Sequence, residues 1–423
     1  MFRFPRPLGL SLALVLVSTS TAGCGMSAAE GGSGSVELSV TASATDRSAM
    51  ESVVEEFQRL HPDVRVKTAF ADINTLQKEL PDQLRAGRGP DVFTVWPGSG
   101  NPASEAALED DDLLENLSLR QFNLRIPEEI QSVVGTSGGS FVVPVSFSAI
   151  GAVWSVRTLD AVGGTPPRTW TELLGLCDTA REHGKVLLAL GNETPWVRQL
   201  ITYALVATTV YADEPDFDIG MQFTGKTFAD SAWKTALRKY LEMDERGCFN
   251  TGTLDTTYEE SLDQVAAGQA VGTVQIASAL SELRAADPGL DLRMTALPAT
   301  DEPADTRMPG AVSAAYGVRA GTPRRKAALA FVDFLGSEAG QNLYNRTGAT
   351  LPALPNESFT ADPAIKEVTT RQKAGTTVSF MDQHWPNSQV QQTHFEQIEA
   401  LFAGRTDVGK ALEAMDAAYL RGE

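Results

Sequence analysis

The sequence predicts an α/β fold in which helices cover both faces of a mainly parallel sheet. Residues 36–42 alternate between apolar and polar side chains, which is typical of a strand. Met50, Val53 and Phe57 follow at helical spacing, and residues 64–66 begin a second strand. A strand, a helix and a strand in this order form a βαβ unit, and its repetition along the chain favours a parallel sheet.

The next elements continue this alternation. Thr45 or Asp46 can cap the first helix, and the residues 61–63, His-Pro-Asp, end it. We expect a helix over residues 75–86 and a strand over residues 91–95. In open sheets of this kind, ligands bind beyond the carboxyl ends of the strands, and these ends are predicted at residues 43–46 and 96–98.

A second group of elements begins at the apolar strand over residues 141–147. This strand continues into residues 149–155 without an intervening helix. Thr169 and Glu172 have the spacing of a capping box, which predicts that a helix begins there. Further on we expect strands over 186–190, 271–275 and 311–318, and helices over 195–209, 231–244, 323–335 and from about 362, the last broken at Trp385-Pro386.

The first residues predict export from the cytoplasm. Arg3 and Arg6 precede the apolar run over residues 8–17, and small residues follow it. These are the parts of a secretory signal peptide, which we place at residues 1–23. The apolar run is too short to cross a membrane stably.

The end of this signal resembles that of bacterial lipoproteins, because small residues stand immediately before Cys24. In such proteins this cysteine is acylated and becomes the mature N-terminus, so Cys24 is the expected lipidation site. Residues 24–35 would then form a flexible Gly/Ser-rich tether that keeps the protein at the outer face of the cell membrane. Thr21 stands where that signal more often has Leu, and ordinary secretion is the alternative.

Composition and charge restrict the partners. The 423 residues are 42% hydrophobic, which is typical of a globular chain of two or three domains. The net charge of −19 repels phosphate backbones, so a nucleic-acid partner is not expected. Beyond the signal, no long apolar run predicts a membrane span.

Cys177 and Cys248 remain when Cys24 is assigned to the anchor. In an oxidising compartment they predict one disulfide, which would close a loop of about 70 residues and contribute about 4 kcal/mol in the chain-entropy model. Two separately buried thiols are the alternative. Neither cysteine has zinc-site spacing with a histidine, so no metal is expected; the histidines are His61, His183, His384 and His394.

Three motifs are better explained by structure than by chemistry. Residues 220–227 fit the phosphate-loop expression, but no buried strand precedes them and no helix follows directly. Residues 135–139 fit the GxSxG of serine hydrolases, but the predicted order of elements is reversed. The acidic run 109–112 is too closely spaced for a calcium loop. We therefore expect no nucleotide or other cofactor and no catalytic residue.

Several aromatic residues lie next to Pro, Gly or polar residues rather than inside apolar runs; they are Trp96, Trp196, Tyr316 and Trp385. Flat rings cover the apolar C–H faces of a sugar, while amides, hydroxyls and carboxylates bind its hydroxyl groups. For any single one of these rings, ordinary packing is the better explanation. As a group, they favour a carbohydrate-binding site.

The order of these segments resembles an extracellular solute-binding lipoprotein of an ABC importer, of family 1, the large carbohydrate-type family that includes maltose-binding protein. The segments that carry the resemblance are Val36–Phe57, Val64–Phe70, Asp91–Val95, Phe141–Leu159, Pro166–Leu174, Gly268–Gln275 and Gly310–Leu354. Ser337-Glu-Ala-Gly-Gln341 and Gly348-Ala-Thr-Leu-Pro352 are typical of the last segment. The resemblance covers nearly all of the chain after the tether.

The resemblance implies a two-lobed periplasmic-binding-protein-like α/β fold of type II, with a ligand cleft between the lobes. Lobe 1 would comprise residues 36–145 and 309–355, and lobe 2 residues 146–308 and 356–423. The implied function is to capture an extracellular mono- or short oligosaccharide and deliver it to a membrane permease, without catalysis and as a monomer.

Position along the family pattern implies the ligand-binding residues. They are Asp46, Trp96, Ser146, Ser148, Asn192, Glu193, Trp196, Gln275, Ser278, Tyr316, Trp385, Asn387 and Gln391. Ser278 and Gln391 stand where relatives that bind long sugars often have an aromatic ring, which favours a smaller or differently shaped sugar. The alternatives are a non-sugar solute such as a polyamine or a phosphate ester, a secreted carbohydrate hydrolase, and a surface adhesion protein.

Overall fold

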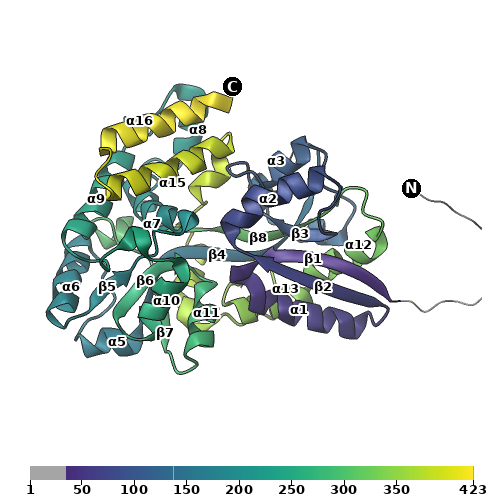
Figure 1. Ribbon diagram of the computed structural model, residues 1–423, viewed down its shortest axis with the longest axis horizontal. Coiled ribbons are helices and arrows are strands. Elements are labelled where there is room, and N and C mark those ends of the chain that lie inside the picture. The colour runs from purple at the N-terminus through teal and green to yellow at the C-terminus, as the bar shows by residue number, and fades with distance from the viewer. Residues whose placement is uncertain (1–34, 137, 423) are drawn as a thin grey trace, which may run out of the picture. The chain divides into compact units, whose positions relative to one another are not determined.

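The computed structural model describes residues 35–136 and 138–422. The predicted signal peptide (1–23), Cys24 and the tether up to residue 34 lie outside these residues, and so does Ser137 of the GxSxG motif. The described chain forms one mixed sheet of ten strands with helices on both sides (Figure 1). Its main path runs in the order β2-β1-β3-β8-β4-β6-β5, with β7 and β9 paired to β4 and β10 paired to β8.

The strands and helices follow the predicted periodicity closely. The strands are β1 (Val36–Ser43), β2 (Val64–Ala71), β3 (Val92–Val95), β4 (Val142–Ser155), β5 (Val186–Ala189), β6 (Ala270–Ile276), β7 (Leu292–Thr295), β8 (Met308–Val318), β9 (Leu351–Pro352) and β10 (Thr377–Val378). The helices of the first half are α1 (Arg47–Leu60), α2 (Ile73–Arg85), α3 (Glu105–Asp110), α4 (Glu128–Val134), α5 (Val156–Ala161), α6 (Trp170–Glu182) and α7 (Arg198–Thr209). Those of the second half are α8 (Phe217–Thr224), α9 (Trp233–Glu245), α10 (Tyr258–Ala266), α11 (Ala279–Ala286), α12 (Arg325–Leu335), α13 (Glu338–Gly348), α14 (Lys366–Lys373), α15 (Ser388–Phe402) and α16 (Val408–Tyr419).

The prediction of a mainly parallel sheet is wrong at its centre. β1 pairs in parallel with β2 and β3, and β5 pairs in parallel with β6. Between these groups, however, β8 is antiparallel to both β3 and β4, and β4 is antiparallel to β6 and β7. The reason is that β4 carries the chain away from the first group of strands and β8 brings it back, so these two neighbours must run in opposite directions.

The buried apolar side chains form two clusters, one at each end of this central pair. Along β4, the residues of the first core are Val142, Val143 and Val145. Those of the second core are Phe147, Ala149, Ile150, Ala152, Val153 and Trp154. β8 divides in the same way, since Met308 belongs to the second core and Val312 to the first. The β4–β8 register shifts around Ser146, where β4 passes from one core to the other. A shift of this kind locally bends and twists a strand.

Local chemistry explains how the first helix begins. Ser43 ends β1 and its hydroxyl accepts a hydrogen bond from the backbone N–H of Thr45, which starts a short 3₁₀ turn. Asp46 then occupies the N-cap position of α1, but its carboxylate makes no capping hydrogen bond. Met50 and Phe57 lie on the buried face of this helix, as predicted. The Asp46 carboxylate is therefore not used to cap the helix.

The second predicted cap is present in a modified form. The Thr169 hydroxyl accepts a hydrogen bond from the backbone N–H of Glu172 and thereby caps α6. The Glu172 carboxylate accepts from the N–H of Arg168 rather than from that of Thr169, as a capping box would require. The helix still begins where the sequence predicts it.

Two of the motif interpretations are supported by the structure. Residues 220–224 lie inside α8, so the phosphate-loop match has no strand before it and no anion-binding turn. The acidic run lies at the end of α3 and the turn after it. Among the described residues, no group of acidic, His and Cys side chains could hold a metal ion, and no helix is long and apolar enough to cross a membrane.

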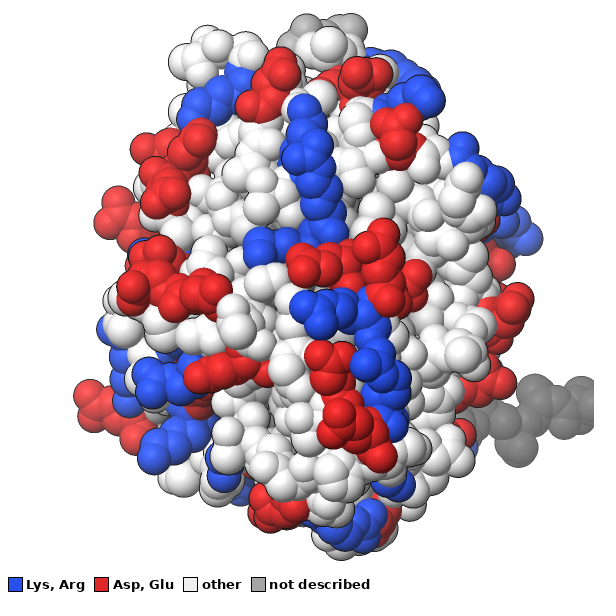
Figure 2. Space-filling view, turned by 90° about the vertical axis from the view of Figure 1, so that its left-hand side faces the viewer, with Lys and Arg blue, Asp and Glu red and all other residues white. Residues whose placement is uncertain are grey.

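The surface charges are interleaved rather than gathered by sign. Asp178 on α6, for example, pairs with both Arg181 and Arg246. Figure 2, which views the side that carries α5, α6 and α9, shows acidic and basic side chains alternating across this face. Exposed pairs of this kind contribute little stability each, about 0–1 kcal/mol.

The predicted disulfide is present: Cys177 of α6 is bonded to Cys248, which follows α9, and both side chains are buried. The bond closes a loop of 71 residues around the α7–α9 region.

We predict that replacing both cysteines with Ala lowers the free energy of unfolding by about 3–4 kcal/mol, because a long loop is released in the unfolded chain. Urea unfolding of both proteins, with and without a reductant, measures this. The reductant should destabilise the wild type and leave the double variant unchanged. Equal stability of the oxidised wild type and the double variant would contradict a stabilising role for the bond.

Candidate binding site

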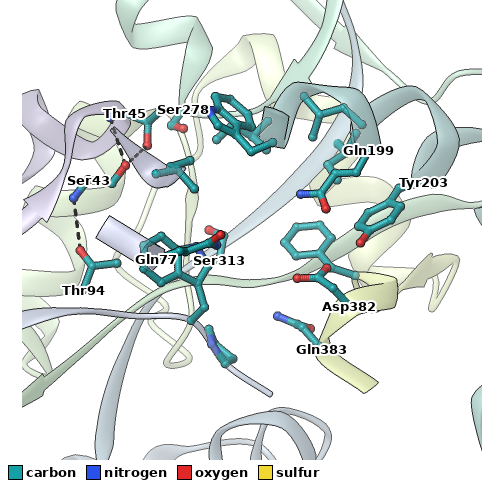
Figure 3. Close-up of a pocket in the computed structure, with 18 of the residues that line it drawn as sticks. Ser43, Thr45, Gln77, Thr94, Gln199, Tyr203, Ser278, Ser313, Asp382 and Gln383 are labelled. Atoms are coloured by element: carbon teal, nitrogen blue, oxygen red, sulfur yellow. Dashed lines mark hydrogen bonds between the residues drawn. The ribbon is translucent and has the colours of Figure 1, made fainter. Parts of the chain in front are cut away.

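A cavity lies where the segments of the first core meet those of the second. Its polar lining residues are Ser43, Thr45, Asp46, Gln77, Thr94, Gln199, Tyr203, Ser278, Ser313, Asp382, Gln383 and Gln391. Its apolar and aromatic lining residues are Ile73, Trp96, Pro97, Ile150, Trp196, Leu200, Ile276, Val312 and Phe380. In Figure 3, Ser43, Thr45 and Thr94 approach the space from one side, and Gln199, Tyr203, Asp382 and Gln383 from the other.

The first side of the cavity is formed by the ends of β1 and β3. The Ser43 N–H donates to the Thr94 hydroxyl over 3.3 Å, and the Ser43 and Thr45 hydroxyls lie 2.8 Å apart. Because β1 and β3 are parallel, their carboxyl ends meet at one edge of the sheet and present these groups together. Gln77 adds an amide from the buried face of α2.

The opposite side is built around Asp382, which lies in the short 3₁₀ helix η7 (Met381–His384). The Gln391 amide donates to the Asp382 carboxylate over 3.1 Å and to the Gln199 side-chain oxygen over 3.3 Å. The neighbouring Gln383 amide donates to the Val312 carbonyl over 2.8 Å, while its side-chain oxygen is buried without a partner among the described residues. Amides and a carboxylate held in this way are positioned to bind hydroxyl groups.

The charged side chains that line the cavity are both acidic. Asp46 and Asp382 contribute carboxylates, whereas none of the described residues that line the space is Lys, Arg or His. Burial raises the pKa of Asp46 to about 6, although a hydrogen bond with Tyr344 limits the rise. Burial likewise raises the pKa of Asp382 to about 6, against the effect of a hydrogen bond with Tyr203. The site therefore tolerates a neutral or cationic ligand and disfavours an anion.

Two tryptophans form the apolar part of the lining. Trp96 follows β3, is partly exposed, and packs against both cores. Trp196 lies in the turn before α7, is 3% exposed, and packs against Tyr258 with ring centroids 4.9 Å apart. Trp96 therefore joins the lining from the end of β3, and Trp196 from the turn before α7.

The structure brings five of the thirteen proposed ligand-binding residues into this lining: Asp46, Trp96, Trp196, Ser278 and Gln391. The order of elements places them there, since each follows a strand or lies on the first turns of a helix that leaves the sheet edge. Their role as ligand contacts remains a prediction.

Five further residues lie near the cavity but not in its lining. The Ser146 hydroxyl lies 3.0 Å from the hydroxyl of Ser313, and Ser313 is a lining residue. The Ser148 hydroxyl accepts from the Ala277 N–H. Asn192 is fully buried against the Tyr240 hydroxyl, Glu193 is exposed, and Gln275 is fully buried without a partner among the described residues.

Tyr316, Trp385 and Asn387 have structural environments. Tyr316 is buried in the first core, with its hydroxyl 3.1 Å from that of Tyr344. Trp385 is buried among the rings of Tyr203, Phe228, Trp233 and His394. Asn387 caps α15 through the Gln389 N–H and donates to the carbonyl oxygens of the last turn of α16. None of the three lines the cavity, and their proposed role as ligand contacts stays a prediction.

Several lining residues were not predicted from the sequence, although one of them carried a visible signal. Gln77 stands between Ile73, Leu80 and Leu84 on the helical face where the spacing calls for an apolar residue. Asp382 carried no such signal, because it lies in an irregular segment and only its neighbour Trp385 drew attention. Gln199 lies on α7, most of whose residues are buried, so its exposure to the cavity could not be read from periodicity.

The walls of the cavity also touch each other directly. The Trp196 N–H donates to the Asn74 side-chain oxygen over 3.3 Å, and the Ser99 hydroxyl donates to the Trp385 carbonyl over 2.6 Å. Gly98 and Gly100 pack so tightly against the backbone of residues 382–383 that an added Cβ would overlap it. The enclosed volume is about 90 Å³, which holds several water molecules but is below the 300–1,000 Å³ typical of ligand pockets.

Solved structures of low sequence identity share this fold. A chitin oligosaccharide binding protein is 20% identical, with a TM-score of 0.76 over 91% of this chain and 98% of its own. A structure from work on xylan utilization by Caldanaerobius polysaccharolyticus is 17% identical, with a TM-score of 0.78 over 90% of this chain and 99% of its own. These likenesses confirm the predicted type II periplasmic-binding-protein-like fold.

Sequence comparisons agree. A probable sugar-binding periplasmic protein of Mesorhizobium japonicum is 26% identical over 99 residues, which span 23% of this chain and 24% of that relative. The match thus covers about a quarter of the relative's length. The sequence model described as "Bacterial extracellular solute-binding protein" matches residues 41–342. The chain therefore belongs to the bacterial extracellular solute-binding protein family, whose members are binding proteins that act outside the cytoplasm.

Proposed function

We propose that this protein is the substrate-binding component of an ABC importer and that it captures an uncharged mono- or short oligosaccharide. One observation carries the proposal: Trp96 and Trp196 face a cavity whose other walls consist of amides, hydroxyls and two carboxylates. Indole rings cover the apolar faces of a sugar ring, and the polar groups accept and donate hydrogen bonds to its hydroxyls. The relatives described as binding sugars or chitin oligosaccharides support the same ligand class.

The lining itself would provide selectivity. A sugar hydroxyl that enters without finding a partner costs about 1–3 kcal/mol, so a fixed set of partners rejects near-identical sugars. The network of Gln391, Asp382 and Gln199 fixes three such partners before any ligand arrives. The absence of Lys, Arg and His from the described lining disfavours sugar phosphates and uronic acids.

Ligand entry requires the two sides of the cavity to separate. We infer that the two cores belong to the two proposed lobes, residues 36–145 with 309–355 and residues 146–308 with 356–423. The small enclosed volume and the contacts of Ser99 and Asn74 across the cavity support a closed form, which a hinge motion would open. A ligand shifts the protein toward the closed form only to the extent that it binds the closed form more tightly than the open form.

Location and delivery complete the proposal. We propose that Cys24 is acylated after removal of residues 1–23 and that residues 24–35 tether the protein to the outer face of the cell membrane. The closed, ligand-bound form would act there as a monomer and present the sugar to a membrane permease.

A cationic solute is the second candidate, because Asp46 and Asp382 would complement a protonated amine. A polyamine or an amino sugar carries such a group. The presence of both tryptophans and four amide side chains favours the neutral sugar, since a simple amine has few hydroxyls for the amides to bind.

A thermal-shift panel tests the ligand class. We expect at least one neutral mono- or oligosaccharide to stabilise the mature protein, by about 2.7 kcal/mol at one hundred times its Kd, and no matching uronic acid or sugar phosphate to do so. Trp96→Ala should weaken binding of that sugar about tenfold, whereas Phe223→Ala, an exposed ring on α8, should not. Stabilisation by polyamines alone would favour the second candidate. No response to any neutral sugar would contradict the proposal.

The ionised Asp382 carboxylate should bind ligand but lower the free energy of unfolding. Its folded pKa of about 6 exceeds the ordinary value of 3.8, so the folded state holds the extra proton between these values and stability falls as the pH rises through about 4 to 6. Asp382→Asn should therefore raise the free energy of unfolding by about 1–3 kcal/mol at pH 7.5, and this gain should disappear near pH 4. Urea unfolding at both pH values measures it. Sugar binding should weaken in the same variant.

The exposed Asp63 provides a matched control, because Asp63→Asn removes the same charge far from a buried environment. It should change stability little at either pH. A gain in Asp382→Asn that is equal at pH 4 and pH 7.5 would refute the assigned titration.

Gly100 tests the closure. A methyl group at this position would overlap the Asp382 carbonyl, so Gly100→Ala should hold the walls apart and weaken sugar binding by about tenfold or more. Gly175→Ala, inside α6 with open space around it, is the control and should bind as the wild type does. Calorimetric titration with the stabilising sugar measures both. Wild-type affinity in Gly100→Ala would show that these walls need not meet.

A further inference from the structure

A second pocket is lined by segments that pack on the second core, and it is separate from the cavity around Asp46 and Asp382, called the sugar cavity below. Its lining comes from the loop before α6, from β7 and the loop after it, and from α14. The lining residues are Pro166, Pro167, Arg168, Arg293, Thr295, Ala296, Pro298, Pro303, Thr306, Glu367, Thr370, Arg371, Ala374 and Thr376. It encloses about 540 Å³, and none of its lining residues is shared with the sugar cavity.

The charge of this pocket is opposite to that of the protein. The chain has a net charge of −19, yet Arg168, Arg293 and Arg371 line the pocket against the single carboxylate of Glu367. Two positive charges are therefore left without a counter-charge in the lining. Asp301 and Asp305 belong to the nearby loop, but neither lines the pocket, and the Asp301 carboxylate is engaged by Thr171.

The arginines differ in how far they are already paired. Arg371 is fixed, since it donates to the Glu367 carboxylate over 2.7 Å and to the Thr306 carbonyl over 2.6 Å. The guanidinium groups of Arg168 and Arg293 are exposed and have no hydrogen bond or ion pair with any described residue. Other described arginines, such as Arg181 and Arg284, are already paired with an acidic side chain.

The remaining walls are rigid. Four prolines stand in the lining, and each has a backbone angle fixed by its ring; Arg168 directly follows two of them, and Arg293 is held on β7. A preorganised site loses less conformational entropy when it binds. Arginine forks match the oxygen atoms of carboxylates and phosphates through paired hydrogen bonds.

We propose that this pocket binds a small dianion through carboxylate or phosphoryl oxygens, with Arg168 and Arg293 as the principal ligands and Arg371 as a fixed wall. The site is independent of the sugar cavity. A hollow of this volume suits a small molecule better than the flat surface of a folded protein.

Calorimetric titration of the mature protein at pH 8 with inorganic phosphate and with succinate, which are both dianions at this pH, tests the proposal and separates the two oxygen chemistries. Sodium chloride at matched ionic strength corrects for general screening. We expect saturable binding of at least one of the two anions, and a loss of about tenfold or more in affinity for it in both Arg168→Gln and Arg293→Gln.

Arg238→Gln is the matched control, because Arg238 on α9 is also exposed and unpaired among the described residues but lies outside the pocket. It should bind the anion as the wild type does, and all three variants should keep the wild-type response to the stabilising sugar. Absence of saturable binding of both anions would overturn the proposal. An equal loss in Arg238→Gln, which would indicate only general charge attraction, would also overturn it.

Discussion

The antiparallel pairing of β4 and β8 is the constraint on which the rest of the structure depends. These two strands run from the first core into the second, so both walls of the cavity are attached to the same pair of strands. Ile150 of β4 and Val312 and Ser313 of β8 lie in the cavity lining itself. The shift in register at Ser146 falls at the passage between the cores, where a bend in the strand would move one wall relative to the other.

Binding and stability oppose each other in this cavity. Carboxylates at Asp46 and Asp382 are held where burial raises their pKa, and the Gln383 side-chain oxygen has no partner among the described residues. Each of these groups destabilises the folded chain without ligand, and in the proposed function each would be satisfied by the hydroxyl groups of the sugar. The disulfide and the rings of Phe228 and Trp233 that pack against Trp385 lie outside the lining, where stabilising contacts do not interfere with binding.

Much of the fold could be predicted from the sequence because hydrophobic periodicity reports burial directly. The strands at Val36–Ser43 and Val92–Val95 and the helix at Arg47–Leu60 were predicted to within a few residues. The antiparallel pairing at the centre of the sheet was not predicted, since the relative direction of two strands depends on which strands become neighbours. For the site, residues that follow strands, such as Asp46 and Trp96, lie at the cavity, whereas Trp385 and Asn387 were assigned by their position along the family pattern and are engaged in packing and capping. The position of Asp382 could not be predicted, because this residue lies in an irregular segment without helical or strand periodicity.

A crystal structure of the mature protein with the stabilising sugar would decide whether this cavity is the binding site. We expect the sugar ring between Trp96 and Trp196, with its hydroxyl groups hydrogen-bonded to Asp46 and Asp382 and with the walls closed around it. A sugar bound outside this cavity, or bound within it without contact to either carboxylate, would contradict the account.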